Sequence, residues 1–299
     1  MKPDTLFPEL NIQLNEPKPV NVASVPQRSL FRYPGGKTWF VPIFRRWLRA
    51  KSVKPTTLIE PFVGGGIISL TALFEDLVSK VIMVEKDDEV AAVWQTIVNK
   101  DTEWLTRRIL TFDLTREAVT NEISKTPRTQ KEKAFQTILK NRTFHGGILA
   151  DGSGLIKNGE NGKGIRSRWY PATLAKRLLN LSCIASRIDF RCDDGLKIMG
   201  EFSAHKEVVY FIDPPYTAGG KNAGKRLYRH SEINHKRLFD ICDSLRGDFL
   251  MTYDNAGEVK ELAQKHGFQT RLVPMSNTHH ATMAELVIGR NLSWMDRLL

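Results

Sequence analysis

The sequence predicts an α/β fold in which a mainly parallel sheet is interrupted by a smaller, mainly helical insertion. Three observations lead to this prediction. Short apolar runs that end on an acid alternate with amphipathic helical segments, as in parallel sheets with crossover helices. The middle of the chain, residues 101–187, has helical periodicity broken by polar loops. Strand-like runs then resume at residue 188 and continue to residue 290.

The first part of the sheet is predicted from residues 37–100. Apolar residues recur at helical spacing from residue 37, and Pro42 suits the first turn of that helix. A strand–helix–strand order follows, and it predicts a right-handed crossover between parallel strands. The predicted strands are 56–60 and 80–85, and the predicted helices are 37–50, 67–77 and 88–100.

The second part of the sheet is predicted from five further apolar runs, with helices between the first three strands. These strands are expected at residues 188–194, 208–216, 247–255, 268–275 and 284–290. The chain is therefore divided into an extended or disordered arm (1–28), a sheet domain (29–100 and 188–299) and the insertion (101–187). Within the insertion, the glycine-rich and basic stretch 145–171 is too polar to be predicted as core.

Composition favours a polyanionic partner. The 299 residues contain 44 Lys and Arg against 33 Asp and Glu, which gives a net charge of +11 and a pI near 9.6. Three scattered cysteines are too few for a disulfide framework or a zinc site, and His279 and His280 have no companion ligands, so no metal is predicted. No run reaches the roughly 20 apolar residues of a membrane span. We expect a soluble, cytoplasmic protein.

The run "VVYFIDPPY", residues 208–216, is the most specific chemical signal. Proline lacks an N–H and restricts φ, so the strand ends here and Asp213 lies on a rigid turn at its carboxyl end. Ligands of open α/β sheets bind at that edge. A carboxylate and a backbone carbonyl there can accept both N–H bonds of a base's exocyclic amino group and free its delocalised lone pair. Tyr216 can stack on the same base.

Two glycine turns suggest a second part of the site. "EPFVGGG", residues 60–66, follows a strand but matches neither the dinucleotide fingerprint nor the P-loop. Glu85 ends the next strand about 20 residues beyond, where an acid can bind ribose hydroxyls; the alternative is a surface acid. "FRYPGGK", residues 31–37, offers an aromatic ring, open amides and a cation, or is simply a loop that enters a helix.

Taken together and in this order, the three segments resemble DNA adenine-N6 methyltransferases of the Dam-like type. The resemblance covers roughly residues 30–289 and extends more weakly to "NRTFHGG", to "LYRHSEINHKRLFDIC" and to "NTHHATMAELVIG". It implies a Rossmann-like methyltransferase sheet, S-adenosylmethionine as the methyl donor, and the insertion as a target-recognition region.

The resemblance also implies roles for individual residues. Asp213 would engage the target amino group, Pro214 would supply the carbonyl, and Tyr216 would stack on the extruded base. Many relatives have aspartate where Glu85 would bind the ribose, and either Asp193 or Asp194 would lie near the cofactor's adenine. The implied catalytic residues are Asp213, Pro214, Pro215 and Tyr216. The implied cofactor-binding residues are Tyr33, Gly35, Gly36, Lys37, Glu60, Phe62, Gly64, Gly66, Glu85, Asp193, Asp194 and Asp213.

Double-stranded DNA is the expected partner, and the adenine must be flipped out of the duplex to reach such a site. The glycine-rich loop of the insertion has cations that can follow phosphates and reach base edges, although it can also be read as a solvated loop. These cations are Lys157, Lys163, Arg166 and Arg168. A restriction endonuclease acting on the same site is a candidate partner, and the oligomeric state is left open.

We therefore expect direct methyl transfer to adenine N6 in duplex DNA at a specific site. No cysteine lies in a motif that would suit a covalent intermediate. Two alternatives remain at this stage. One is an amino-methyltransferase that acts on RNA adenine or on cytosine N4, and the other is a catalytically dead DNA-binding module.

Overall fold

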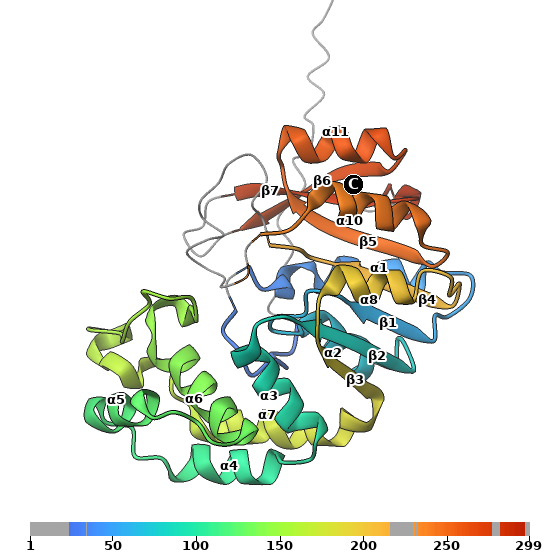
Figure 1. The fold of residues 1–299 in the computed structure, drawn as a ribbon. Coiled ribbons are helices and arrows are strands. Elements are labelled where there is room, and N and C mark those ends of the chain that lie inside the picture. Colours follow the sequence, from blue (N-terminus) through green and yellow to red (C-terminus); the bar gives the residue numbers. More distant parts are fainter. Residues whose placement is uncertain (1–23, 34, 216–229, 231, 277–281, 297–299) are drawn as a thin grey trace, which may run out of the picture.

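The computed structural model describes residues 24–33, 35–215, 230, 232–276 and 282–296. Within this part of the chain, seven strands form one sheet in the order β3-β2-β1-β4-β5-β7-β6 (Figure 1). The first five strands in this order are parallel, and β7 runs antiparallel between β5 and β6. The strands are β1 (Thr57–Glu60), β2 (Lys80–Glu85), β3 (Ile188–Cys192), β4 (Val208–Ile212), β5 (Asp248–Asp254), β6 (Gln269–Ser276) and β7 (Thr282–Gly289).

Helices cover both faces of the sheet, because successive strand residues point to opposite sides. In β4, Val209 and Phe211 belong to a hydrophobic cluster with α1, α2 and α3, whereas Tyr210 and Ile212 belong to one with α8, α10 and α11. The helices are α1 (Val41–Arg49), α2 (Ile67–Phe74), α3 (Asp88–Val98), α4 (Thr102–Thr111), α5 (Arg116–Ser124), α6 (Gln130–Thr143), α7 (Pro171–Ile184), α8 (Gly195–Glu201), α10 (His235–Ser244) and α11 (Gly257–Lys265).

The predicted Rossmann-like α/β sheet is confirmed by this topology. All seven predicted strands are present, and Pro42 lies in the first turn of α1, as expected. Helix α2 ends at Phe74, before the predicted residue 77, because Asp76 adopts a φ of 49° that no helix can continue.

The strand order turns back at β1, which pairs with β2 on one side and with β4 on the other. The carboxyl ends of β1 and β4 therefore lie side by side, with Ile59 opposite Tyr210. Ligands of open α/β sheets bind at such a switch point. The register brings the turn 60–66 next to the turn 213–215, although the two are far apart in the sequence.

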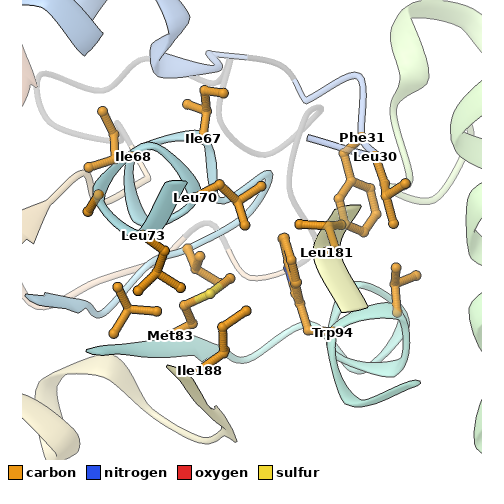
Figure 2. Packing of buried hydrophobic residues seen from close by; sticks show 14 of the residues in the cluster. Leu30, Phe31, Ile67, Ile68, Leu70, Leu73, Met83, Trp94, Leu181 and Ile188 are labelled. Carbon is orange, nitrogen blue, oxygen red and sulfur yellow. The ribbon is translucent and has the colours of Figure 1, made fainter. Parts of the chain in front are cut away.

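The insertion helices α4–α7 form a group beside α3 (Figure 1). The insertion and the sheet domain share one hydrophobic core, because α6 and α7 of the insertion pack on α3 of the sheet domain. Figure 2 shows Trp94 of α3 among Phe31, Met83 of β2 and Leu181 of α7.

The prediction that residues 145–171 are too polar to be core was wrong in part. Ile165 and Trp169 are buried in the same hydrophobic cluster as the insertion helices. Charged residues and glycines dominate the composition of the stretch, so its composition does not reveal that Ile165 and Trp169 pack on the helices and anchor the loop.

The end of the predicted N-terminal arm packs on the sheet domain. Val25 is buried, and Arg28 forms an ion pair with Glu75 at 3.3 Å. Tyr216, His279 and His280 lie outside the described residues. None of the described helices combines the length and apolar character that a membrane crossing requires.

Candidate functional site

A cavity of about 480 Å³ opens at the carboxyl ends of β1, β2, β4 and β5. It gathers segments that are far apart in the sequence, including nearly all of the residues predicted to be catalytic or to bind the cofactor. The predicted residues that line it are Tyr33, Gly35, Gly36, Lys37, Glu60, Phe62, Gly64, Gly66, Glu85, Asp194, Asp213, Pro214 and Pro215. The lining also includes residues to which the sequence had assigned no role, among them Leu149 and Ala150 of the insertion and Asn234, Arg237 and Asp254. Asn234 and Arg237 belong to the weakly matching segment "LYRHSEINHKRLFDIC".

Glu85, at the end of β2, is a carboxylate held by backbone amides. The N–H groups of Lys86 and Asp87 donate to its Oε1, each at 2.9 Å, and Gly64 donates to Oε2 at 3.0 Å. Burial raises the pKa of Glu85 to about 7, while these hydrogen bonds oppose the rise. The reading of Glu85 as an isolated surface acid is therefore wrong, since its carboxyl group is anchored at the cavity.

The glycine turn packs closely against aromatic rings. Gly64 has a φ of 44°, and a Cβ built there would lie 2.6 Å from the ring of Tyr33. Gly66 has a φ of 67°, and a Cβ there would lie 2.8 Å from Trp94, whose indole N–H donates to the Gly64 carbonyl at 3.0 Å. The glycines at positions 64 and 66 are thus required for the protein's own packing.

The structure separates the two acids that follow β3. Asp194 lines the cavity and caps α8 by accepting the backbone N–H groups of Leu196 and Lys197. Asp193 instead pairs with Lys197 at 2.6 Å and is not among the lining residues described. Geometry therefore favours Asp194 as the acid that faces a ligand.

Asp213 is held at the end of β4 by two groups on other elements. Lys37 Nζ lies 2.9 Å from its Oδ1, and Thr252 Oγ1 of β5 donates to the same oxygen at 2.9 Å. Lys37 also contacts Glu285 of β7 at 3.2 Å and donates to the Gly35 carbonyl at 3.1 Å. Sequence reasoning missed Thr252 and Glu285. The signal for Glu285 was an acid within the apolar run "MAELVIG", which a buried strand tolerates only with a partner.

Glu60 is a second buried carboxyl group at the cavity, at the end of β1. It is 4% exposed, and both the N–H and the hydroxyl of Ser69 donate to its Oε2. Burial raises the pKa of Glu60 to about 8; the Ser69 hydrogen bonds oppose this, and the negative charge of Asp213 adds to it. Glu60 therefore keeps its proton near neutral pH.

Replacing Glu60 by glutamine is expected to stabilise the fold increasingly as pH rises. Between its ordinary pKa of 4.5 and about 8, the folded state holds a proton that the unfolded chain releases, so stability falls as pH rises through this window. Glutamine cannot ionise and avoids this loss, which amounts to at most about 1.4 kcal/mol per pH unit. Thermal unfolding from pH 5 to pH 8 should show a Tm difference that widens with pH. A constant difference, equal to that of the exposed control Glu261→Gln, would contradict the shifted ionisation.

Asn141 of α6 joins the insertion to the cavity. Its side chain accepts the Arg32 N–H at 2.9 Å and donates to the carbonyls of Arg32 and Gly147 at 2.9 and 2.8 Å. Asn141 is 1% exposed, so these bonds hold the "FRYPGGK" segment against the insertion. The only sequence signal for a role of Asn141 was the weak match of the segment "NRTFHGG".

The four predicted cations of the insertion loop differ in their surroundings. Lys157 and Lys163 are exposed, Arg166 is exposed and donates from Nε to the Leu114 carbonyl at 3.1 Å, and Arg168 is partly buried. None of these is among the described residues that line the cavity. Arg168 is one of three arginines, with Arg177 and Arg32, whose positive charges act on Arg142. Burial, as the main cause, and these charges lower the pKa of Arg142 to about 9.

The family model for the D12 class of N6 adenine-specific DNA methyltransferases matches residues 33–277 of this sequence. No curated protein matches the sequence. Among solved structures, the rRNA methyltransferase aviRa from Streptomyces viridochromogenes is similar, with 14% identity over 89% of this chain and 90% of the other and a TM-score of 0.39. The tRNA methyltransferase TrmK from B. subtilis has 11% identity over 85% of this chain and 67% of the other, with a TM-score of 0.34. TM-scores this low do not bear on the substrate.

Proposed function

Because this chain belongs to the family of D12 class N6 adenine-specific DNA methyltransferases, we propose that it methylates N6 of a flipped-out adenine at a specific site in duplex DNA. One observation carries the proposal: Asp213, followed by two prolines, lies on the wall of the same cavity as the glycine turn and Glu85. A methyl acceptor and a methyl donor that share this cavity would be brought into direct contact.

Enzymes of this family take the methyl group from S-adenosylmethionine, whose positively charged sulfur activates it. Two features of the cavity support its fit. The volume of about 480 Å³ lies within the usual range for small-molecule sites, and the anchored carboxyl group of Glu85 suits vicinal hydroxyls. In this proposal Glu85 binds the ribose, Asp194 lies near the adenine of the cofactor, and Tyr33 and Lys37 contact its methionine end.

Asp213 and Pro214 are the proposed catalytic groups. A carboxylate oxygen of Asp213 accepts one N–H bond of the adenine amino group, and the Pro214 carbonyl accepts the other. These two acceptors draw the nitrogen toward tetrahedral geometry, which makes its lone pair available. The amino nitrogen would form a bond to the methyl carbon as the bond between that carbon and the donor's sulfur breaks, and the sulfur would leave as a neutral thioether. The nitrogen would also give up one proton, which Asp213 can accept as a base. Thr252 and Lys37 hold the carboxylate in place for both steps.

The insertion is the proposed target-recognition region, and its basic loop follows the DNA backbone. Lys163 and Arg166 are expected to contact phosphates and to release counterions on binding. The net charge of +11 favours the same partner.

Replacing Lys163 and Arg166 with alanine should weaken DNA binding and reduce the slope of log affinity against log salt by about 2, because each phosphate that is no longer neutralised lowers the slope by about 1. Fluorescence anisotropy from 50 to 200 mM salt measures both quantities. The pair Lys260→Ala and Lys265→Ala on α11 removes the same charge from exposed positions and serves as the control. Equal slopes in the two double variants would contradict the role of the loop.

The function itself is tested by incubating the protein with labelled S-adenosylmethionine and either duplex DNA or RNA, followed by nucleoside analysis. Label in N6-methyladenine from duplex DNA is the expected result. Label in RNA would show that RNA is the substrate, and label in N4-methylcytosine would show that cytosine N4 is the methyl acceptor; either result would contradict the proposed function. Cofactor binding without incorporation into any of them would favour a catalytically inactive DNA-binding protein.

A further inference from the structure

Three charged groups meet on the wall of the cavity, and two of them come from outside the predicted catalytic turn. Lys37 Nζ lies between Asp213 Oδ1 at 2.9 Å and Glu285 Oε1 at 3.2 Å. Lys37 is 5% exposed and Glu285 is 4% exposed. Asp213 and Lys37 line the cavity, whereas Glu285 is not among its described lining residues.

The hydrogen bonds of Lys37 account for an ammonium group. An ammonium has three N–H donors, and the described residues include three acceptors for them: Asp213, Glu285 and the Gly35 carbonyl. Two carboxyl groups thus contact the same ammonium group. Because charges interact strongly at buried sites, the second carboxylate determines how much of the lysine's charge acts on the first.

Other ionisable groups also face Asp213. Glu60 lies close enough for their charges to interact, and it keeps its proton near neutral pH. Tyr253 of β5 also feels the charge of Asp213, and burial keeps its pKa well above the ordinary value, so it is neutral. Among these groups of the described chain, Lys37 forms an ion pair with Asp213, and Glu285 forms an ion pair with Lys37.

We propose that Glu285 is a positioning residue that acts through Lys37 and keeps Asp213 a strong hydrogen-bond acceptor and base toward the target amino group. This inference rests on the proposed function. With Glu285 present, the lysine orients Asp213 while the carboxyl group of Glu285 offsets part of the lysine's positive charge. Without that compensation, the full ammonium charge acts on Asp213, which makes its carboxylate a weaker base and a weaker acceptor.

The test is Glu285→Gln, because glutamine keeps an oxygen for Lys37 and removes only the charge. We expect kcat on the pH plateau to fall about tenfold. The acid limb of the kcat–pH profile should move to lower pH by about one unit, because a nearby negative charge, which favours the protonated form of an acid, has been removed. A role in folding alone would lower Tm and kcat and leave the limb in place, so an unmoved limb would overturn the proposal.

A second variant separates charge from shape. Glu285→Asp keeps the charge and shortens the side chain by one methylene, so it should lower kcat while the acid limb stays within about 0.3 units of wild type. If this variant shifted the limb as far as Glu285→Gln, charge would not be the cause and the proposal would fail. Glu261→Gln, on the exposed face of α11, is the control for adding a glutamine.

Failure of this inference is distinct from failure of the proposed function. If the wild-type protein transfers no methyl group to DNA adenine, the function is wrong. If wild type is active and the two Glu285 variants keep its limb, only the role of Glu285 is wrong. Cofactor affinity within about threefold of wild type in each variant, measured by calorimetry, shows that the cavity is intact.

Discussion

Asp213→Ala should reduce turnover of methyl transfer by about a hundredfold to a thousandfold while leaving cofactor affinity within about threefold of wild type. The carboxylate is the acceptor that prepares the amino nitrogen and takes its proton, and alanine offers neither function. Asp213→Asn should lose nearly as much activity, because its amide keeps the size of the side chain but cannot act as a base. Single-turnover assays with labelled cofactor measure the loss, and calorimetry measures cofactor binding.

The fold should tolerate loss of Asp213. Lys37 would still contact Glu285 and the Gly35 carbonyl, so the buried ammonium keeps a charged partner. Asp243→Ala, an exposed acid on α10, serves as the control for loss of a carboxylate. Turnover near the wild-type value in Asp213→Ala would remove Asp213 from the chemistry and, with it, the proposed mechanism.

Gly64→Ala should lower cofactor affinity at least about tenfold and also destabilise the fold. Two costs add at this position. The first is the positive φ of 44°, which costs an ordinary residue roughly 1–2 kcal/mol. The second is the clash of the new Cβ with the ring of Tyr33 at 2.6 Å, which must push either the ring or the turn into the cavity.

Gly267→Ala, after the end of α11, is the matched control for Gly64→Ala. Its φ is 66°, and a Cβ built there would meet no atom within 4 Å, so it carries the first cost alone. We expect a modest fall in Tm for Gly267→Ala with unchanged cofactor affinity, and a larger fall with weakened binding for Gly64→Ala. Equal behaviour of the two variants would show that the packing of Tyr33 on the turn does not shape the cavity.

Local sequence patterns were sufficient where the signal lies within one segment. The seven strands follow from apolar runs, and the ends of β1, β2 and β4 follow from Glu60, Glu85 and the two prolines after Asp213. Such features depend on neighbouring residues, whose preferences act over a few positions. The order of the three motifs also sufficed to indicate the family, which the family model confirms.

Contacts between residues that lie far apart in the sequence could not be predicted from these local patterns. Asn141 holds Arg32 across 109 positions, and Thr252 holds Asp213 across 39. Neither pair has a periodicity or spacing that connects its members. The choice between Asp193 and Asp194 was likewise open in the sequence, because adjacent acids have the same local preferences, and only their capping and ion-pair contacts distinguish them.

The sequence by itself determined the kind of sheet, the rigid acidic turn at Asp213 and the class of chemistry that such a turn serves. Tertiary structure alone decided which charged groups meet near that carboxylate. Lys37 lies far before it in the sequence, and Glu285, which contacts Lys37, lies after it on β7. The physical reason is that the strength of an ionic contact depends on distance and burial in three dimensions. Both are set by the strand order, in which β5 places Thr252 beside the end of β4, and β7, on the other side of β5, places Glu285 in contact with Lys37.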